Sequence, residues 1–326
     1  MIKKVIILTN ILILSCGTRN KIVQYFKREL NGIGKVFATD NSELAPALYE
    51  ADEYFIVPKI DDPNYLDHIL KICREYNVSG VISLIDPELS ILASNKEKFI
   101  EIGTIPIVSD IDVINASFNK FSFNELLKKN GFNHMKCYIE LANFYEDLND
   151  NVIDFPVFVK PVDGSASINI NKIDSKEELE LLFTKYDNLM IQEYMDGFEF
   201  GVDVYIDLIS KQPVSIFIKE KLKMRAGETD KSISVIDAKL EELVKNFVKI
   251  VEYNGVIDID IFKVDDEYYI SEVNPRFGGG YPHGFEAGVN IPRQIIKNLN
   301  NEMNNVELNN YKKGTYMMKY NEITFK

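Results

Sequence analysis

Two β-patterned runs in the last third of the chain carry four side chains that could bind a metal through oxygen: Asp258, Asp260, Glu272 and Asn274. In the first run aspartate alternates with isoleucine, which is the period of a strand with one acidic and one apolar face. A three-residue loop at 265–267 would place Asp260 opposite Glu272 and Asp258 opposite Asn274. Facing carboxylates repel each other, and oxygen ligands favour a hard cation, Mg²⁺ or Mn²⁺. The alternative is a solvated acidic hairpin, and a two-residue loop would put Asp260 and Glu272 on opposite faces.

An arginine and a run of glycines directly follow the second of these runs. Arg276 stands two residues after Asn274, and Gly278, Gly279 and Gly280 come next. A guanidinium group can bind phosphate through two hydrogen bonds. Arg276 beside clustered carboxylates therefore indicates a site for phosphate as well as for metal.

A second phosphate signal lies near the middle of the chain. Lys160 closes an apolar run, and an Asp-Gly pair follows it, which between two strands is first of all a turn signal. The side chains after Asp163 are all small, so backbone N–H groups there could approach a polyphosphate closely. They are Gly164, Ser165, Ala166 and Ser167. A structural turn and a phosphate-covering loop both remain open from these residues alone.

A charged stretch at 219–228 is a candidate for substrate recognition. Arg225 could bind a substrate carboxylate or an acyl phosphate, and Glu228 could bind an amine. The alternative is a solvated run of charge. A loop containing Gly279, Gly280 and His283 would lie near the acceptor, and such mixed charges suit a substrate that resembles an amino acid.

Composition limits the class of protein. With 326 residues, 46% of them hydrophobic, the chain can bury a large core in two or three domains. A net charge of −13 argues against nucleic acid as a partner. The three cysteines are widely spaced, which predicts neither disulfides nor a zinc site and suits a cytoplasmic protein. No membrane-length apolar run follows the N-terminus, and we expect no membrane partner.

The N-terminus allows two interpretations. Lys3 and Lys4, an apolar run and then Cys16 resemble a signal peptide that ends in a lipid-attachment cysteine. Alternatively, residues 11–14 form the first buried strand of an α/β sheet. We favour the strand, because Asn10 interrupts the apolar run and residues 20–30 continue as an amphipathic helix.

The elements that must position these residues fall into two patterns. Up to about residue 115, short apolar strands alternate with helices, which predicts a parallel sheet covered by helices, with polar residues such as Arg19 and Asp86 at strand ends. Helix capping is the alternative role for those residues. From about residue 137, antiparallel strands with helices predict an α+β region. The Asn-rich segment beyond 298 is predicted to be peripheral.

The order of these features resembles the ATP-grasp superfamily. A first lysine (Lys120), Lys160, the glycine loop, Gln192-Glu-Tyr194 and Glu272-Val-Asn-Pro-Arg276 follow one another as in ligases similar to the synthetase halves of the carbamoyl-phosphate synthase large subunit. The resemblance spans about residues 10–292. It implies a pre-ATP-grasp α/β domain (1–115), a helical connector (116–136), an ATP-grasp lid (137–197) and a C-terminal subdomain with the metal site and tail (198–326).

The resemblance also implies roles for individual residues. Lys120 and Lys160 would contact the ATP phosphates, and residues 164–167 would cover them. Glu193 and the backbone of Tyr194 and Met195 would hold adenine, and Glu199 the ribose. Asp260, Glu272 and Asn274 would bind two Mg²⁺ ions, and Arg276 the γ-phosphate. Many relatives have glutamine where Asp260 stands, so this metal site would be more negative than theirs.

The implied activity is that of an ATP- and Mg²⁺-dependent ligase. It would join a small carboxylic acid, such as an amino acid, to an amine, ammonia or a thiol through an acyl phosphate, and release ADP and phosphate. Two alternatives are a non-catalytic MgATP-binding or regulatory module and a lipid-anchored binding protein. The oligomeric state stays open, with a homodimer as one option.

Overall fold

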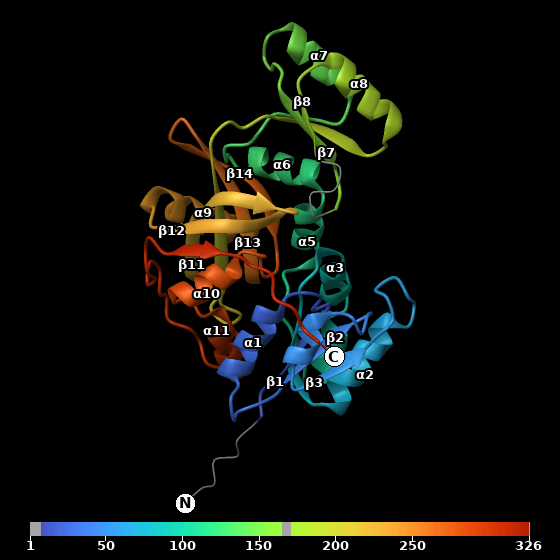
Figure 1. Ribbon diagram of the computed structural model, residues 1–326, viewed down its shortest axis with the longest axis vertical. Coiled ribbons are helices and arrows are strands. Elements are labelled where there is room, and N and C mark those ends of the chain that lie inside the picture. Colours follow the sequence, from blue (N-terminus) through green and yellow to red (C-terminus); the bar gives the residue numbers. More distant parts are fainter. Residues whose placement is uncertain (1–7, 165–170, 326) are drawn as a thin grey trace, which may run out of the picture.

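The computed structural model describes residues 8–164 and 171–325, and these form three β-sheets (Figure 1). The first sheet is parallel, with the strand order β3-β2-β1-β4-β5. Its strands are β1 (Asn10–Leu14), β2 (Val36–Asp40), β3 (Glu53–Ile56), β4 (Val78–Ser83) and β5 (Ile105–Pro106). The predicted parallel α/β sheet is confirmed. We call it and its helices the N-terminal domain.

Helices cover this sheet because their apolar faces pack on its buried strands. They are α1 (Asn20–Glu29), α2 (Tyr65–Glu75), α3 (Asp86–Ser94) and α4 (Lys96–Glu101), with a 3₁₀ turn at Pro46–Glu50. Every residue of β1 is buried at the centre of the sheet, and Cys16 beyond it is fully buried. The strand interpretation of the N-terminus is confirmed, and a lipid on Cys16 would disrupt this core.

Two helices, α5 (Ile111–Phe118) and α6 (Lys120–Lys129), lead to a small second sheet of strand order β6-β9-β7-β8. We call this sheet, together with helices α7 and α8, the lid; it projects from the rest of the molecule in Figure 1. Its elements are β6 (Cys137–Tyr138), α7 (Leu141–Asn149), β7 (Val157–Pro161), β8 (Asn171–Ile173), α8 (Lys176–Lys185) and β9 (Leu189–Glu193). The predicted covering residues Ser165, Ala166 and Ser167 lie outside the described residues.

The third sheet has the order β14-β13-β10-β11-β12-β15 and is antiparallel in every pair. Its strands are β10 (Phe198–Ile206), β11 (Pro213–Arg225), β12 (Glu228–Val235), β13 (Gly255–Val264), β14 (Glu267–Asn274) and β15 (Tyr316–Met318); its helices are α9 (Ala238–Val251), α10 (Tyr281–Ala287) and α11 (Ile291–Leu299). The predicted antiparallel strands of the α+β region are confirmed. The segment beyond 298 is less peripheral than predicted, because β15 pairs with β12 as an edge strand.

No helix among residues 8–164 and 171–325 is long and apolar enough to cross a membrane.

Candidate active site

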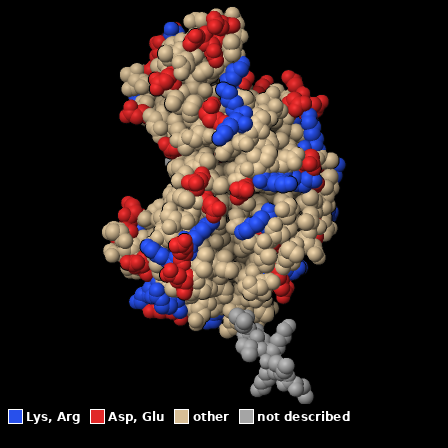
Figure 2. Space-filling model, turned by 180° about the vertical axis from the view of Figure 1, so that it is seen from behind, with Lys and Arg blue, Asp and Glu red and all other residues tan. Residues whose placement is uncertain are grey.

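A cleft of about 1130 Å³ lies where the lid, the N-terminal domain and the third sheet meet. Figure 2 shows the molecule hollowed between the lid and the N-terminal domain, with acidic and basic side chains along the hollow. Most of the predicted site residues line this cleft: Lys120, Lys160, Gly164, Glu193, Tyr194, Met195, Glu199, Glu228, Asp260, Glu272, Asn274, Arg276, Gly279 and Gly280. Residues far apart in the sequence are thus brought to one place.

Lys160 is a buried cation on the lid side of the cleft. It lies on β7 and is only 6% exposed, and its ammonium group forms no hydrogen bond or ion pair with any described residue. Burial lowers the pKa of Lys160, although Glu272 across the cleft acts to raise it. A buried ammonium group without a partner is costly, so an anionic ligand in the cleft would stabilise it.

Lys120 is held against the glycine loop by the start of α6. Its Nζ donates a hydrogen bond to the carbonyl oxygen of Gly164. Asn119 caps the helix by accepting from the Ser122 N–H, and its Nδ2 donates to Asp163 Oδ1 at 2.9 Å. The helix start, the lysine and the first residues of the loop are therefore fixed together beside the cleft.

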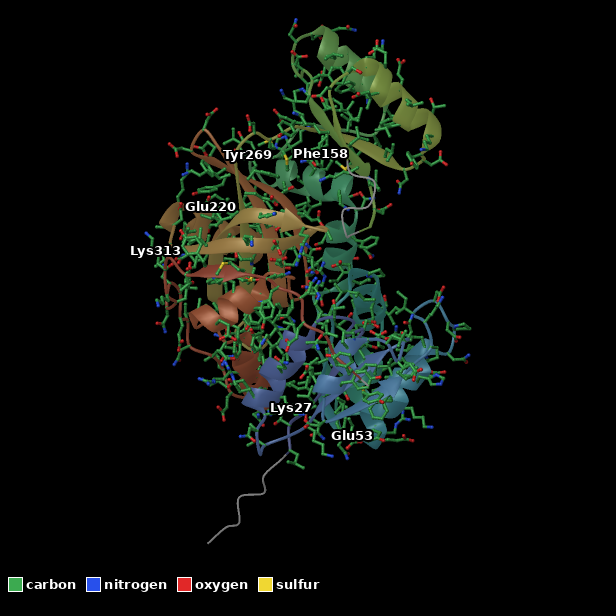
Figure 3. All side chains as sticks on the ribbon, viewed as in Figure 1. Lys27, Glu53, Phe158, Glu220, Tyr269 and Lys313 are labelled. Atoms are coloured by element: carbon green, nitrogen blue, oxygen red, sulfur yellow. The ribbon has the colours of Figure 1, made fainter. Side chains whose placement is uncertain are left out.

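The segment predicted for adenine lies where β9 ends. The Glu193 carboxylate accepts a hydrogen bond from the Lys136 N–H at 3.2 Å. Beyond Glu193 the chain leaves the sheet, so the backbone groups of Tyr194 and Met195 are outside the ladder. Phe158 on β7 also lines this part of the cleft, and Figure 3 places it at the end of the lid nearest the body.

The predicted pairing of the acidic hairpin is confirmed, but by a different route. Asp260 faces Glu272, and Asp258 faces Asn274. The turn has only two residues, Asp265 and Asp266, both at positive φ as in the hairpin turns that suit twisted strands. The pairing register shifts between Ile261 and Asp260, so that Ser271 on β14 has no paired residue on β13. This bulge restores the facing pairs that a two-residue turn alone would have separated.

The resulting oxygen groups fit a divalent cation that also contacts a phosphate. The Glu272 carboxylate forms no hydrogen bond or ion pair with a described residue. Burial is the main cause that raises the pKa of Asp260. Among the described residues, no three His, Cys, Asp or Glu side chains are arranged to hold a metal alone. Two carboxylates with the Asn274 amide match Mg²⁺, which typically takes one or two carboxylates together with water and substrate phosphates.

Two lysines that the sequence analysis did not select cross the sheet to these acids. Lys219 Nζ lies 2.6 Å from Asp203 Oδ2 and 3.7 Å from Asp258 Oδ1. Lys221 Nζ lies 2.8 Å from Glu199 Oε1 and 2.6 Å from Asp260 Oδ1. Both lysines are almost completely buried. The sequence shows that Lys219 and Lys221 are two positions apart, as residues on one face of a strand are. It does not show that their acidic partners lie on β10 and β13.

Arg276 is anchored by the N-terminal domain. Its Nη2 donates to Asp86 Oδ2 at 2.9 Å and to Asn274 Oδ1 at 3.0 Å, and its Nη1 donates to the Phe277 carbonyl. Although burial acts to lower it, the Asp86 carboxylate raises the pKa of Arg276 above its ordinary value. Asp86 is the first residue of α3, where a carboxylate is favoured by the helix dipole.

A second interdomain ion pair lies on the same side of the cleft. Arg19 Nη2 is 2.9 Å from Glu228 Oε1, and Lys319 Nζ is 2.8 Å from Glu228 Oε2. Gly279 packs against this ion pair so closely that a side chain would not fit. A Cβ atom at this position would lie 2.8 Å from both Arg19 Nη1 and Glu228 Cδ. The sequence analysis placed Arg19 only at a strand end, with helix capping as the alternative, and it assigned no role to Lys319.

The structure does not bring two of the predicted residues into the cleft. Arg225, at the end of β11, pairs with Asp230 at 3.2 Å and is not among the residues that line the cleft. His283 is buried in α10, where its Nδ1 lies 2.8 Å from Ser232 Oγ and its Nε2 lies 3.0 Å from Thr315 Oγ1. Both side chains are therefore occupied by local partners.

Family models and known proteins agree with this architecture. A model of the PylC-like N-terminal domain matches residues 11–108, and a model of the ATP-grasp domain matches residues 118–280, half of the chain. The chain belongs to the ATP-grasp family, and the predicted class, an ATP-grasp ligase, is confirmed.

Three similar proteins illustrate the range of this likeness. The chain is 24% identical over 289 residues to carbamoyl-phosphate synthase of Methanobrevibacter smithii, covering 84% of this chain and 76% of that protein. It is 27% identical over 172 residues to D-alanine–D-alanine ligase of Helicobacter hepaticus, covering 45% of this chain and 48% of the ligase, about half its length. In fold it resembles the biotin carboxylase domain of Hydrogenobacter thermophilus 2-oxoglutarate carboxylase, crystallised with MgADP, ADP and bicarbonate (TM-score 0.75, 16% identity, 95% of this chain and 73% of that one).

Proposed function

We propose that the chain is an ATP- and Mg²⁺-dependent ligase that activates a small carboxylic acid as an acyl phosphate and joins it to an amine. The observation that carries this proposal is that two opposite charges face each other across one cleft, the buried Lys160 ammonium group and the Glu272 carboxylate, and that neither has a hydrogen-bond or ion-pair partner among the described residues. A magnesium-bound triphosphate satisfies both groups at once, because its oxygens pair with the lysine while its cation pairs with the carboxylate. The ligases among the relatives support the same reaction class.

The nucleotide would be held by groups that line the cleft. Glu193, Tyr194 and Met195 would hold adenine, Glu199 the ribose, and Lys120 and Lys160 the phosphates. Asp260, Glu272 and Asn274 would hold Mg²⁺, or Mn²⁺ in its place. When bound, the cation would neutralise charge that develops on the transferred phosphoryl group.

The reaction has two steps. A carboxylate oxygen of the substrate attacks the γ-phosphorus, the bond to the β–γ bridging oxygen breaks, and ADP leaves with the electron pair. The amine then attacks the acyl carbon, phosphate leaves, and the amine loses a proton. Arg276 would stabilise the phosphoryl group in both steps, and Glu228 with Gly279 and Gly280 would line the side where the amine arrives. The enclosing lid would limit hydrolysis of the acyl phosphate by water.

Trapping the intermediate tests the proposal. Protein incubated with ATP, Mg²⁺, single amino acids and hydroxylamine should form a hydroxamate from one of them and release ADP in proportion. Glu272→Gln should reduce that rate on the order of 10²–10³-fold, whereas Glu267→Gln, exposed on the same strand, should not. MgATP binding without any carboxylate-dependent ADP release would instead support the regulatory module.

A further inference from the structure

The Arg19–Glu228 ion pair is open to the cleft, on the side proposed for the acceptor amine. The side chains of Arg19 and Glu228 are 24% and 44% exposed, and both residues line the cleft. Arg19 Nη2 contacts Glu228, whereas Nε and Nη1 form no hydrogen bond with a described residue. The guanidinium end lies at the cleft wall, because Nη1 is 2.8 Å from the position that a Cβ atom of Gly279 would occupy, and Gly279 also lines the cleft. Arg19 therefore has donors that can reach a bound ligand.

The charge of this group is not balanced by its own residues. Lys319, directly after β15, contacts the second oxygen of Glu228 at 2.8 Å. Among residues 8–164 and 171–325, no other carboxylate forms an ion pair with Arg19 or Lys319. Although burial acts to raise it, the charges of Arg19 and Lys319 lower the pKa of Glu228, so the carboxylate stays ionised. Two cations thus share one carboxylate, which leaves an excess positive charge beside the cleft.

Neighbouring acids do not occupy Arg19. Asp86 and Asp258 act on Arg19 over longer distances, but each has a nearer cation of its own, at 2.9 Å and 3.7 Å. Glu228 is itself poorly suited to bind an amine, because both of its oxygens already contact a cation. The group that remains open for a ligand is the guanidinium of Arg19, and guanidinium groups bind carboxylates and phosphates.

The position in the fold also points to a ligand. In the sheet order β3-β2-β1-β4-β5, β2 lies on one side of β1 and β4 on the other, so β1 and β4 flank a topological switch point. Ligands of open α/β sheets bind in the crevice outside the carboxyl ends of such strands. Arg19 lies between the end of β1 and the start of α1, at this crevice.

We infer that Arg19 is a specificity-determining residue that selects an acceptor amine carrying an anionic group, a carboxylate or a phosphate, to which its free N–H groups donate. This inference rests on the proposed ligase function. Glu228 would hold the guanidinium in place, and Lys319 would prevent Glu228 from neutralising it completely. Amino acids would then be accepted as amines, whereas ammonia and simple alkylamines lack the group that Arg19 binds.

The competing explanation is that the ion pair only holds the N-terminal domain against the third sheet. Arg19 belongs to that domain, and Glu228 begins β12 of the sheet. In that case the protein would be indifferent to the charge of the acceptor. Loss of Arg19 would then affect charged and uncharged acceptors alike.

Acceptors that differ only in charge distinguish these explanations on the wild-type protein. The carboxylic acid that forms a hydroxamate is supplied with ATP and Mg²⁺, and acceptor-dependent ADP release is measured. The acceptors are the standard amino acids, each beside its neutral amide, and ethanolamine phosphate beside ethanolamine. We expect at least one anionic amine to give a kcat/KM at least 10-fold above that of its neutral counterpart. A preferred amino acid would identify a carboxylate as the recognised group, and preferred ethanolamine phosphate would identify a phosphate.

Two negative results have different meanings. A preference below 10-fold in every pair, or no activity with any anionic amine, would overturn the inference and leave the ligase function standing. Failure of every carboxylic acid to form a hydroxamate would refute the proposed function itself, and the inference with it.

Variants then separate recognition from domain contact. The measured quantity is the ratio of kcat/KM for the preferred anionic amine to kcat/KM for hydroxylamine. Arg19→Gln should lower this ratio at least 10-fold, mainly through the KM of the amine, because a charge-assisted hydrogen bond is lost. An unchanged ratio, with both rates reduced together, would show a structural role and overturn the inference.

Arg74→Gln is the matched control, at an exposed arginine of α2 outside the cleft lining, and should leave the ratio unchanged. Because the acceptor series uses wild-type protein, the inference stays testable even if Arg19→Gln fails to fold.

Discussion

Lys221 and Asp260 form an ion pair across an intervening strand, with 2.6 Å between Nζ and Oδ1. Lys221 lies on β11 and Asp260 on β13, and β10 runs between them. The lysine side chain is 4% exposed, and it also contacts Glu199 at 2.8 Å. The proposed metal ligand and the proposed ribose ligand therefore share one internal cation.

Replacing this lysine should destabilise the protein in a way that a divalent cation can partly reverse. Lys221→Met leaves Asp260 and Glu199 without a counter-charge, and breaking a buried pair typically costs about 3–5 kcal/mol. Because Mg²⁺ would replace the missing charge, it should raise the melting temperature of Lys221→Met more than that of the wild type. Thermal unfolding with and without MgCl₂ checks this, with the exposed Lys223→Met as the control. An equal response of all three proteins would contradict the shared-cation role.

Gly201 is expected to be intolerant of a side chain, because both lysines pass over it. A Cβ atom at this position would lie 3.0 Å from Lys219 Cε and 3.3 Å from Lys221 Cε. Overpacking of this kind typically costs about 1–3 kcal/mol, so Gly201→Ala should unfold at lower denaturant concentration. In a double-mutant cycle with Lys221→Ala, which removes the Cε atom near Gly201, the effects should be less than additive. Strict additivity would show that Lys221 does not fill this space.

The sequence was sufficient for the fold class and for most of the cleft. Period-two alternation at 257–261 and the spacing of Glu272 and Asn274 placed the acids on shared faces, and the structure confirms their pairing. The bulge at Ser271 could not be foreseen, because a register shift depends on packing along the whole hairpin rather than on local residue types. The predicted three-residue loop gave the right pairs for the wrong reason.

Contacts between domains were the other feature that the sequence could not supply. Asp86 and Arg276 are 190 positions apart, and Arg19 and Glu228 come from different domains. Local patterns indicated only that Arg19 and Asp86 follow strands, with helix capping as an equal alternative. The pairing of these charges depends on how the N-terminal domain packs against the third sheet. The spacing of apolar residues within single elements gives no information about that packing.

Arg225 should matter much less than its place in a charged run suggests. Its guanidinium pairs with Asp230, its side chain is 53% exposed, and it lies outside the cleft lining. We expect Arg225→Ala to keep kcat/KM within about threefold, since a single exposed pair is worth roughly 0–1 kcal/mol. Steady-state kinetics against Arg276→Ala, which should lose most activity, provide the comparison. A 100-fold loss would mean that the tip between β11 and β12 closes over the substrate during turnover.

His283 should make the stability of the fold depend on pH between about 6.5 and 4. Burial, together with the nearby Lys219 charge, lowers the pKa of His283 from 6.5 to about 4, against the opposing hydrogen bond to Thr315. The folded protein therefore keeps this histidine neutral while the unfolded chain takes up a proton, so the free energy of unfolding falls as pH falls through this window. At about 1.4 kcal/mol per pKa unit, the loss is at most roughly 3 kcal/mol.

Because carboxylates also titrate in this pH range, the test is the difference in free energy of unfolding between wild type and His283→Gln, measured by urea unfolding at several pH values. That difference should shrink on acidification, whereas His68→Gln, at an exposed position on α2, should follow the wild-type curve. Parallel curves for wild type and His283→Gln would show that His283 takes up a proton as readily in the folded protein as in the unfolded chain.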